Sequence, residues 1–281
     1  MKEHIKRILK TLKLYRLVVY FYCELELIYG KCKNIFLYIH SLFLNYRFIE
    51  QGTADGLPFP PVKLIHLVTN TYRYDWFYKS GLFGKESIKS ILQKNNFDIN
   101  QFEAILDFGC GCGRMMRQWK TLKGFKLFGT DYNPLLVSWC QRNLPFAEFM
   151  VNSPNRPLSY PDEAFDFIYA ISVFSHLDES MGDFWIRELS RVLKPGGLIY
   201  MTVMGAERAA LLSLELKKQF EDGQLIVLGE EDLFSNTCAA FHPESYVRYM
   251  LPESLQVFDF IPGGAKDAQQ DVFLLQKVRK A

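Results

Sequence analysis

The chain has 281 residues, 49% of them apolar, and a formal net charge of +2. A chain of this length can bury one substantial core, because single α/β domains of about 200 to 250 residues are common. The small net charge gives no broad cationic field, and the C-terminal two thirds contain no basic stripe interleaved with aromatic residues. These features argue against a nucleic-acid substrate.

Six cysteines are spread along the chain without the density or spacing of a disulfide scaffold. This usage predicts a reducing, cytoplasmic setting. Cys110 and Cys112 lie one residue apart, but no further Cys or His stands at a spacing that a zinc site would need. We therefore expect no metal, and we interpret the two cysteines as small side chains in a tight turn.

The first fifty residues are basic, with nine Lys or Arg against four Asp or Glu. Their periodicity predicts an amphipathic helix. Its apolar side is formed by Ile5, Ile8, Leu9, Leu12, Tyr15 and Val19, and its basic side largely by Lys2, Lys6, Lys10, Lys13 and Arg16. The longest apolar run, residues 17–23, is far short of the ~20 residues of a membrane span, and no signal-peptide cleavage site follows it.

A second helix is expected over the apolar residues 35–48, and the proline-rich stretch 52–61 marks a linker. We therefore divide the chain into a helical appendage, residues 1–55, and a body, residues 56–281. Two interpretations of the appendage stay open. It can lie on an anionic membrane surface, at the inner face of the membrane, or it can pack on the body or on a partner subunit. The oligomeric state is not predicted.

The body contains short apolar runs separated by segments that are long enough for helices. The runs are residues 104–108, 126–131, 147–152, 165–172 and 198–203, and residues 115–121 can form the helix behind the first run. Repeated strand and helix units predict a doubly wound α/β fold with a mostly parallel sheet. Residues 256–261 and 271–278 are too close in sequence for a helical crossover, so we expect an antiparallel hairpin at the sheet edge.

A glycine-rich turn follows the first strand, in the sequence DFGCGCGR, residues 107–114. Gly109, Gly111 and Gly113 allow a positive φ and a close approach of backbone to a ligand. Asp107 is placed to order the turn or to meet a cationic group. The nearest alternative is the dinucleotide fingerprint G-x-G-x-x-G, but Arg114 occupies the position of its third glycine.

Several segments resemble a bacterial group of class I S-adenosylmethionine-dependent methyltransferases, of types 11 and 12, that is often associated with cell-surface glycans or lipids. The segments are ILDFGCGCGR, FGTDYNP, SVFSHL, RVLKPGG, FHPESYVR and QQDVFLL. The resemblance implies a seven-stranded Rossmann-like sheet with an antiparallel last strand. It also implies that S-adenosylmethionine is the cofactor and that Cys110 belongs to the cofactor-binding turn.

Polar residues at the ends of the next strands are candidates for contacts with the nucleoside. Asp131 ends the second strand, where a carboxylate can accept hydrogen bonds from both ribose hydroxyls. Tyr132 can pack on the adenine ring or be an ordinary half-buried residue. The resemblance places Asn152 near the adenine amine, although an Asn before Ser-Pro also suits a plain turn. Ser172, at the end of the fourth strand, points toward the reaction region together with Phe174 and His176.

A hydroxyl acceptor would be helped by a general base, and a neutral histidine suits that role best. His176 and His242 are the two candidates, each with a structural role as the alternative. The long insertion 205–254 is expected to form a helical cover or an acceptor-binding wall. The N/D-P-P-Y/F signature of enzymes that methylate amino groups in nucleic acids is absent.

The leading hypothesis is an enzyme that transfers a methyl group from S-adenosylmethionine to a small-molecule, saccharide or glycolipid acceptor, at a hydroxyl oxygen. One alternative is a nicotinamide-dependent reductase, which would share the fold and Asp131. The other is a non-catalytic scaffold at a membrane surface that binds S-adenosylmethionine.

Overall fold

The computed structural model describes residues 35–36, 39–41, 43, 45–46, 48, 50, 52–122, 124–154, 156–229 and 238–279. The chain divides into two compact units, Met1–Gln51 and Gly52–Ala281. The amphipathic helix expected in the first residues of the chain lies outside the described residues. Those described between residues 35 and 50 are helical. Within the described ranges, no helix is both long and apolar enough to cross a membrane.

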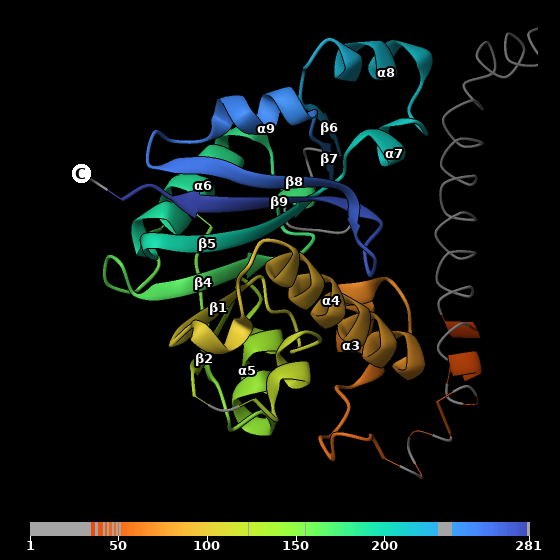
Figure 1. Cartoon of the computed structure of the whole chain (residues 1–281). Coiled ribbons are helices and arrows are strands. Elements are labelled where there is room, and N and C mark those ends of the chain that lie inside the picture. The colour runs from red at the N-terminus through yellow and green to blue at the C-terminus, as the bar shows by residue number, and fades with distance from the viewer. Residues whose placement is uncertain are drawn as a thin grey trace, which may run out of the picture. The chain divides into compact units, whose positions relative to one another are not determined.

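The second unit is built on a seven-stranded sheet with the order β3-β2-β1-β4-β5-β9-β8 (Figure 1). Its strands are β1 Ala104–Phe108, β2 Lys126–Asp131, β3 Glu148–Val151, β4 Phe165–Ala170, β5 Leu193–Val203, β8 Leu255–Ala265 and β9 Gln270–Lys277. The first five strands pair in parallel, whereas β9 runs antiparallel to both β5 and β8. This confirms the doubly wound, mostly parallel sheet with an antiparallel last strand.

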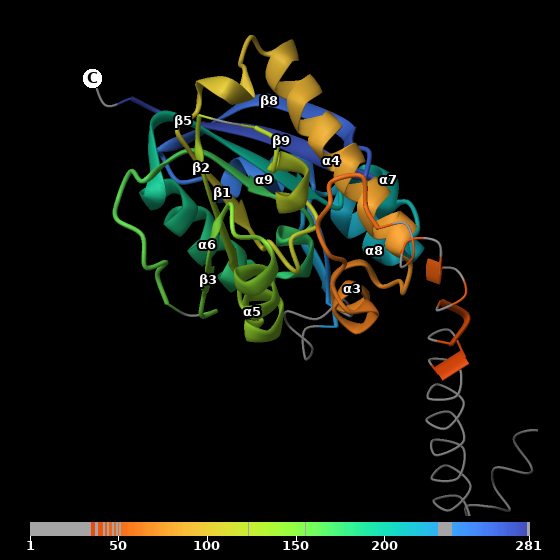
Figure 2. The same ribbon diagram turned by 90° about the horizontal axis from the view of Figure 1, so that it is seen from below.

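Helices cover both faces of this sheet. Helices α3 (Val62–Thr69), α4 (Tyr74–Lys94) and α5 (Pro134–Asn143) pack on one face, and α6 (Glu179–Val192) and α9 (Glu244–Met250) pack on the other. Figure 2 shows α4 and α6 on opposite sides of the strands. Along β4, Phe167 and Tyr169 join the first core, while Ile168 and Ala170 join the second. A parallel sheet buried on both faces accounts for such continuous apolar runs.

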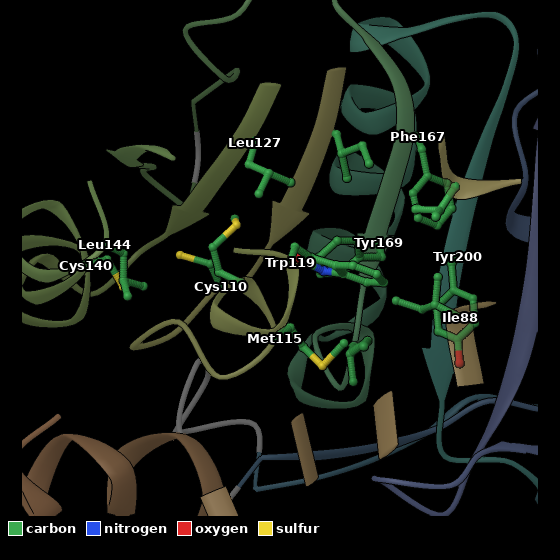
Figure 3. Packing of buried hydrophobic residues seen from close by; sticks show 14 of the residues in the cluster. Ile88, Cys110, Met115, Trp119, Leu127, Cys140, Leu144, Phe167, Tyr169 and Tyr200 are labelled. Atoms are coloured by element: carbon green, nitrogen blue, oxygen red, sulfur yellow. The ribbon is translucent and has the colours of Figure 1, made fainter. Parts of the chain in front are cut away.

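The first core anchors the segment that follows the glycine turn. Trp119 donates a hydrogen bond from Nε1 to the hydroxyl of Tyr169, 3.2 Å away, and both side chains are almost fully buried (Figure 3). Arg117, whose side chain is 1% exposed, forms an ion pair with Asp55 at 2.8 Å. Asp55 thereby fixes the stretch before α3 against the body, since a buried guanidinium is stable only when it is paired.

The sequence did not predict three local features correctly. Residues 115–121 form only a 3-10 helix, Met116–Trp119, because its four side chains are all buried and none provides the solvent face of an amphipathic helix. The strand expected over residues 198–203 begins earlier, because residues 194–197 form an irregular stretch within β5, with Leu193 opposite Phe165 and Leu198 opposite Phe167. The insertion contains helices α7 (Ala206–Ala209) and α8 (Leu214–Glu221), and also an unexpected strand pair, β6 (Ile226–Leu228) and β7 (Ala239–Phe241).

Candidate functional site

The glycine turn lies at the carboxyl end of β1, where it adopts the backbone that only glycine tolerates well. Gly109, Gly111 and Gly113 have φ angles of 79°, 54° and 79°. A Cβ atom on Gly111 would lie 2.8 Å from Cγ2 of Val68 in α3. The turn is therefore closed from outside by α3, which leaves no room for a side chain at Gly111.

Asp131 connects the end of β2 to this turn. Its Oδ2 accepts a hydrogen bond from the Gly111 N–H at 2.9 Å, and its Oδ1 accepts one from the Asn133 N–H at 2.8 Å. Burial raises the pKa of Asp131, and these two N–H donors lower it in part. Each carboxylate oxygen can accept at least one more hydrogen bond. The geometry therefore fits a second role as acceptor for two ribose hydroxyls.

Asp107 lies beneath the turn and is 3% exposed. Burial raises its pKa to about 7, although Tyr169 and Arg114 act in the opposite direction. Its Oδ2 is buried and has no hydrogen-bond partner in the part of the chain that the structure describes. A buried carboxylate oxygen without a donor is unfavourable, so this atom fits the ammonium of a ligand.

A cavity of about 530 Å³ opens over the turn, within the range of about 300–1,000 Å³ for small-molecule sites. It brings together residues from the ends of β1, β2, β3 and β4. The candidates that line it are Asp107, Gly109, Cys110, Gly111, Asp131, Tyr132, Asn152, Ser172 and His176. Most of the predicted cofactor residues are thus gathered around one space.

His176 contributes a ring with a defined tautomer. Its Nδ1 lies 2.6 Å from the carbonyl oxygen of Cys238. Because a carbonyl only accepts, Nδ1 must carry the proton, and Nε2 of the neutral ring is left able to accept one. Burial lowers the pKa of His176, and the bond to Cys238 offsets this in part. The ring is therefore neutral at pH 7 and suited to act as a base.

Ser172 takes a structural position beside the cavity. It has a positive φ of 57°, which is uncommon for a residue other than glycine. Its N–H donates to Oγ1 of Thr202 at 2.8 Å, and its hydroxyl donates to Oε1 of Gln270 at 3.1 Å. These bonds join the ends of β4, β5 and β9, so Ser172 holds the chain in the orientation that presents His176.

Three predicted residues are not brought to the cavity. Gly113 is absent from its lining, and a Cβ there would meet Leu144 and Cys140, so this glycine serves close packing. Phe174 is fully buried in the second core and does not point toward the reaction region as expected. His242 lines a separate cavity, and burial lowers its pKa to about 4.

The sequence reasoning missed one wall of the cavity. It is formed by Leu67, Val68 and Thr69 of α3, by Trp76 of α4, and by Arg208, Asp267 and Gln270. Trp76 stands in the aromatic stretch TYRYDWFYKSG at the beginning of α4. The Trp76 side chain is 41% exposed, and the periodicity of the sequence could not predict this exposure. Among the described residues, no group of His, Cys, Asp and Glu is arranged to hold a metal ion.

Comparison with known protein families agrees with the fold and with the arrangement of the candidate site. Residues 106–201, from β1 to β5, match the model of a methyltransferase domain. This segment of the chain is therefore similar to a methyltransferase domain. The glycine turn, Asp131 and His176 all lie inside the matched segment.

Curated relatives match about half of the chain. Sterol 24-C-methyltransferase from Schizosaccharomyces pombe is 30% identical over 158 residues, which are 49% of this chain and 40% of that protein. Cycloartenol-C-24-methyltransferase from Arabidopsis thaliana is 25% identical over 154 residues, covering 48% and 44% of the two chains. The chain thus spans less than half the length of these relatives.

Solved structures support the fold of the methyltransferase domain. A structure described as a sarcosine dimethylglycine methyltransferase from Galdieria sulphuraria has a TM-score of 0.50 and 15% identity, and the match covers 70% of this chain and 85% of that one. A chain from the complex of the Haloferax volcanii Trm112 methyltransferase activator with a methyltransferase also has a TM-score of 0.50, at 12% identity, with 79% and 100% covered. At these identities the likeness concerns the fold alone.

Proposed function

We propose that this protein transfers the methyl group of S-adenosylmethionine to a hydroxyl oxygen of a small-molecule, saccharide or lipid-linked acceptor. The observation that carries the proposal is the hydrogen bond from the Gly111 N–H to Asp131 at the edge of the cavity. It fixes a glycine turn and a carboxylate with spare acceptor capacity in one site. This combination suits a bound nucleoside, because the carboxylate can accept hydrogen bonds from the ribose hydroxyls and the glycines let the ligand come close to the backbone.

In this proposal, residues at the ends of different strands bind different parts of the cofactor. Asp131 accepts the ribose hydroxyls, Tyr132 and Asn152 contact the adenine, and Asp107 receives the ammonium of the amino-acid tail. The unpartnered Oδ2 of Asp107 supports the last assignment. Bound there, S-adenosylmethionine supplies the electrophilic methyl group, and the chain aligns the acceptor for an in-line displacement.

His176 is the proposed general base. Its Nδ1–H is held by the Cys238 carbonyl, so Nε2 can take the proton of an acceptor hydroxyl as the new O–C bond forms. His242 was the other candidate, and its place in a second cavity disfavours it. Ser172 is assigned a positioning role, because its hydroxyl is engaged by Gln270.

A second candidate reaction is the methylation of a carbon atom in an apolar, sterol-like lipid. The names of the curated relatives favour it, because they describe methylation at C-24 of sterols and cycloartenol. The cavity wall contains Leu67, Val68 and Trp76, which suit an apolar acceptor. A panel that contains a sterol alkene and hydroxylated saccharides would separate the two reactions by product mass and position of the label.

The cofactor proposal is tested by isothermal titration with S-adenosylmethionine, S-adenosylhomocysteine and NADH. We expect both sulfur nucleosides to bind and NADH not to bind. Asp131→Ala should weaken their binding about 10- to 100-fold, since it removes two charge-assisted acceptors and loosens the turn. Asp183→Ala is the matched control, because Asp183 is an exposed carboxylate on α6 that pairs with Arg187.

Each other outcome points to a different function. Unchanged affinity in Asp131→Ala, or no binding of either sulfur nucleoside, would contradict the proposal. Binding of NADH in their place would favour the nicotinamide-dependent reductase. Binding of S-adenosylmethionine without methyl transfer to any acceptor in a cell extract would favour the non-catalytic scaffold.

We also propose that the basic appendage brings the enzyme to an anionic membrane surface, with glycan- or lipid-linked molecules as its acceptors. The periodicity of the first twenty residues supports this, and so do the exposed apolar side chains of Ile35, Phe36 and Phe43. The relatives described above come from a fungus and a plant. The bacterial origin that the motifs suggested stays a prediction.

A further inference from the structure

Arg208 is a cation in the cavity wall that has no carboxylate partner among the described residues. It lies in α7, which follows β5. One of its Nη atoms donates to the carbonyl oxygen of Ala268 at 3.2 Å. Its Nε is buried and reaches no acceptor within the described part of the chain. A guanidinium offers five N–H donors, so most of the binding capacity of Arg208 is left for a ligand.

The other charges near this end of the cavity do not neutralise Arg208. Arg114 also lines the cavity, but it donates to Oδ2 of Asp267 at 2.8 Å. The Oδ2 atom of Asp267 is therefore already paired, and its side chain is fully buried, while its Oδ1 reaches no hydrogen-bond donor among the described residues. His176 carries no charge at neutral pH. Asp107 and Asp131 also line the cavity, but they lie at the ends of β1 and β2. On the β5 and β9 side two guanidiniums thus face one carboxylate, which leaves a local excess of positive charge in a partly desolvated space.

Gln270 provides a neutral donor in the same wall. Its Oε1 accepts hydrogen bonds from the hydroxyls of Thr202, at 2.6 Å, and Ser172, at 3.1 Å. These two bonds fix the orientation of the amide. Its Nε2 makes no hydrogen bond to any described residue, although Gln270 is 6% exposed and lines the cavity. Apart from the bond from Arg208 to Ala268, the N–H groups of this fixed amide and of the guanidinium have no acceptor among the described residues.

The sheet order separates these donors from the proposed ribose partner. Asp131 ends β2, whereas Arg208 lies in α7, just after the end of β5, and Gln270 begins β9. Strand β5 is three strands from β2 in the order β3-β2-β1-β4-β5-β9-β8, about 14 Å at the usual spacing of about 4.8 Å. Figure 1 shows α7 at the β5 and β9 side of the sheet and α5 at the β2 side. Arg208 thus lies toward the acceptor end of the cavity.

We infer that Arg208, assisted by Gln270, binds an anionic group of the acceptor, a carboxylate or a phosphate ester. This inference rests on the proposed methyl transfer and deepens it. The acceptor then combines a site of methylation near His176 with an acidic group about one strand further along the sheet. Such an acceptor differs in charge from the neutral sterols that the names of the curated relatives describe. An acidic saccharide or an acidic lipid headgroup satisfies the condition.

The test uses the full chain saturated with S-adenosylhomocysteine, titrated calorimetrically with three probes. They are benzoate, inorganic phosphate and benzyl alcohol, which is the neutral analogue of benzoate. At fixed ionic strength we expect at least one anion to bind with a roughly millimolar Kd and benzyl alcohol to bind at least about tenfold more weakly. A preference between benzoate and phosphate identifies the carboxylate or the phosphate ester as the acidic group.

The variants Arg208→Gln and Arg208→Lys complete the test. Arg208→Gln should weaken anion binding roughly 10- to 100-fold and leave the Kd of S-adenosylhomocysteine unchanged, while Arg208→Lys should retain part of the anion affinity. Arg187→Gln, at an exposed ion pair on α6, is the matched control and should change neither. Equal binding of all three probes, or no anion binding at about 50 mM, would overturn the inference.

Two further results distinguish a failure of this inference from a failure of the proposed methyl transfer. If Arg208→Gln weakens S-adenosylhomocysteine as strongly as the anions, Arg208 holds the carboxylate of the cofactor, and the inference is wrong while the proposed function stands. If the unsubstituted chain does not bind S-adenosylhomocysteine at all, the proposed function itself has failed before any probe is added.

Discussion

Asp107 is the residue whose charge reports most directly on ligand binding. Burial raises its pKa to about 7, so near neutral pH the unliganded protein contains both the protonated and the ionised form of this carboxyl. An ammonium placed against its unpartnered Oδ2 would favour the ionised form. The same shift makes the unliganded chain lose stability as the pH rises from about 4 toward 7, since the folded chain keeps a proton that the unfolded chain releases.

We therefore predict that binding of S-adenosylmethionine at pH 7 releases a fraction of a proton. Titration calorimetry in buffers of different ionisation enthalpy measures this number. Asp107→Asn should remove the dependence on the buffer and weaken binding, whereas Asp183→Asn on the surface should retain it. A buffer dependence that persists in Asp107→Asn would mean that another group loses the proton.

His176 gives a prediction about the acidic side of the pH profile. Burial lowers the pKa of His176 below its ordinary value of 6.5, so the neutral, reactive ring persists until the pH falls below that value. Activity should be lost as the pH decreases through the folded pKa, and the acidic limb of kcat/KM should lie below pH 6.5. His176→Gln should lower kcat by about 10²- to 10⁴-fold without changing the Kd of the cofactor.

His66→Gln is the control for this prediction. His66 lies in α3 and stacks on Tyr72, and burial also lowers the pKa of His66, but its side chain does not line the cavity. The variant His66→Gln should have the same acidic limb in its kcat/KM profile and the same kcat as the unsubstituted chain. An acidic limb above pH 6.5, or a full kcat in His176→Gln, would show that no general base acts at this position.

At the scale of the elements, α3 and the glycine turn form one unit, because Val68 closes over Gly111. We predict that Gly111→Ala lowers the melting temperature and weakens cofactor binding at least about tenfold. The double variant Gly111→Ala with Val68→Ala should recover the steric part of the loss. It should not recover the cost of the left-handed backbone, about 1–2 kcal/mol for a residue with a Cβ.

Thermal unfolding and calorimetry of the two single variants and the double variant measure both parts. Val68→Ala alone should bind the cofactor nearly as well as the unsubstituted chain does. Losses that simply add in the double variant would mean that α3 does not press on the turn.

The strands of the sheet could be predicted from sequence because each contains a short apolar run, and most of these runs are separated by segments long enough for helices. The order of apolar runs also gave the antiparallel hairpin, since residues 262–270 are too few for a crossover. Strands β6 and β7 could not be predicted, because three residues carry no usable periodicity. The 3-10 helix after the turn was mistaken for an α-helix because its burial depends on Asp55 and Tyr169, which are distant in sequence.

The residues of the candidate site also differ in whether they could be predicted from the sequence. Asp107 and Asp131 lie at the ends of β1 and β2, and Gly111 lies in the turn after β1, so local patterns identified them. Trp76 and Arg208 come from opposite sides of the matched segment, residues 106–201, and reach the cavity only through the packing of α4 and the insertion. No spacing rule joins positions so far apart. His242 was chosen for its residue type, whereas its separate cavity follows from the path of the insertion.

At the scale of the whole molecule, the two units differ in charge and therefore in their expected partners. Residues 1–50 hold nine Lys or Arg against four Asp or Glu, and the remaining chain holds 24 against 27. A basic amphipathic segment gains about 1 kcal/mol per cation near an anionic lipid surface, and the gain is screened by salt. The slightly acidic body gains nothing there, so binding to a membrane should depend on the appendage alone.

We predict that the full chain floats with liposomes rich in phosphatidylserine at low salt and does not float with neutral liposomes. Replacing five cations of the appendage by Gln should abolish flotation; they are Lys2, Lys6, Lys10, Lys13 and Arg16. The matched control replaces five exposed lysines of the body by Gln, namely Lys63, Lys79, Lys126, Lys218 and Lys266. Equal loss in both variants would indicate a general effect of charge. Flotation that survives the loss of the appendage cations would leave packing on the body or on a partner as the role of this unit.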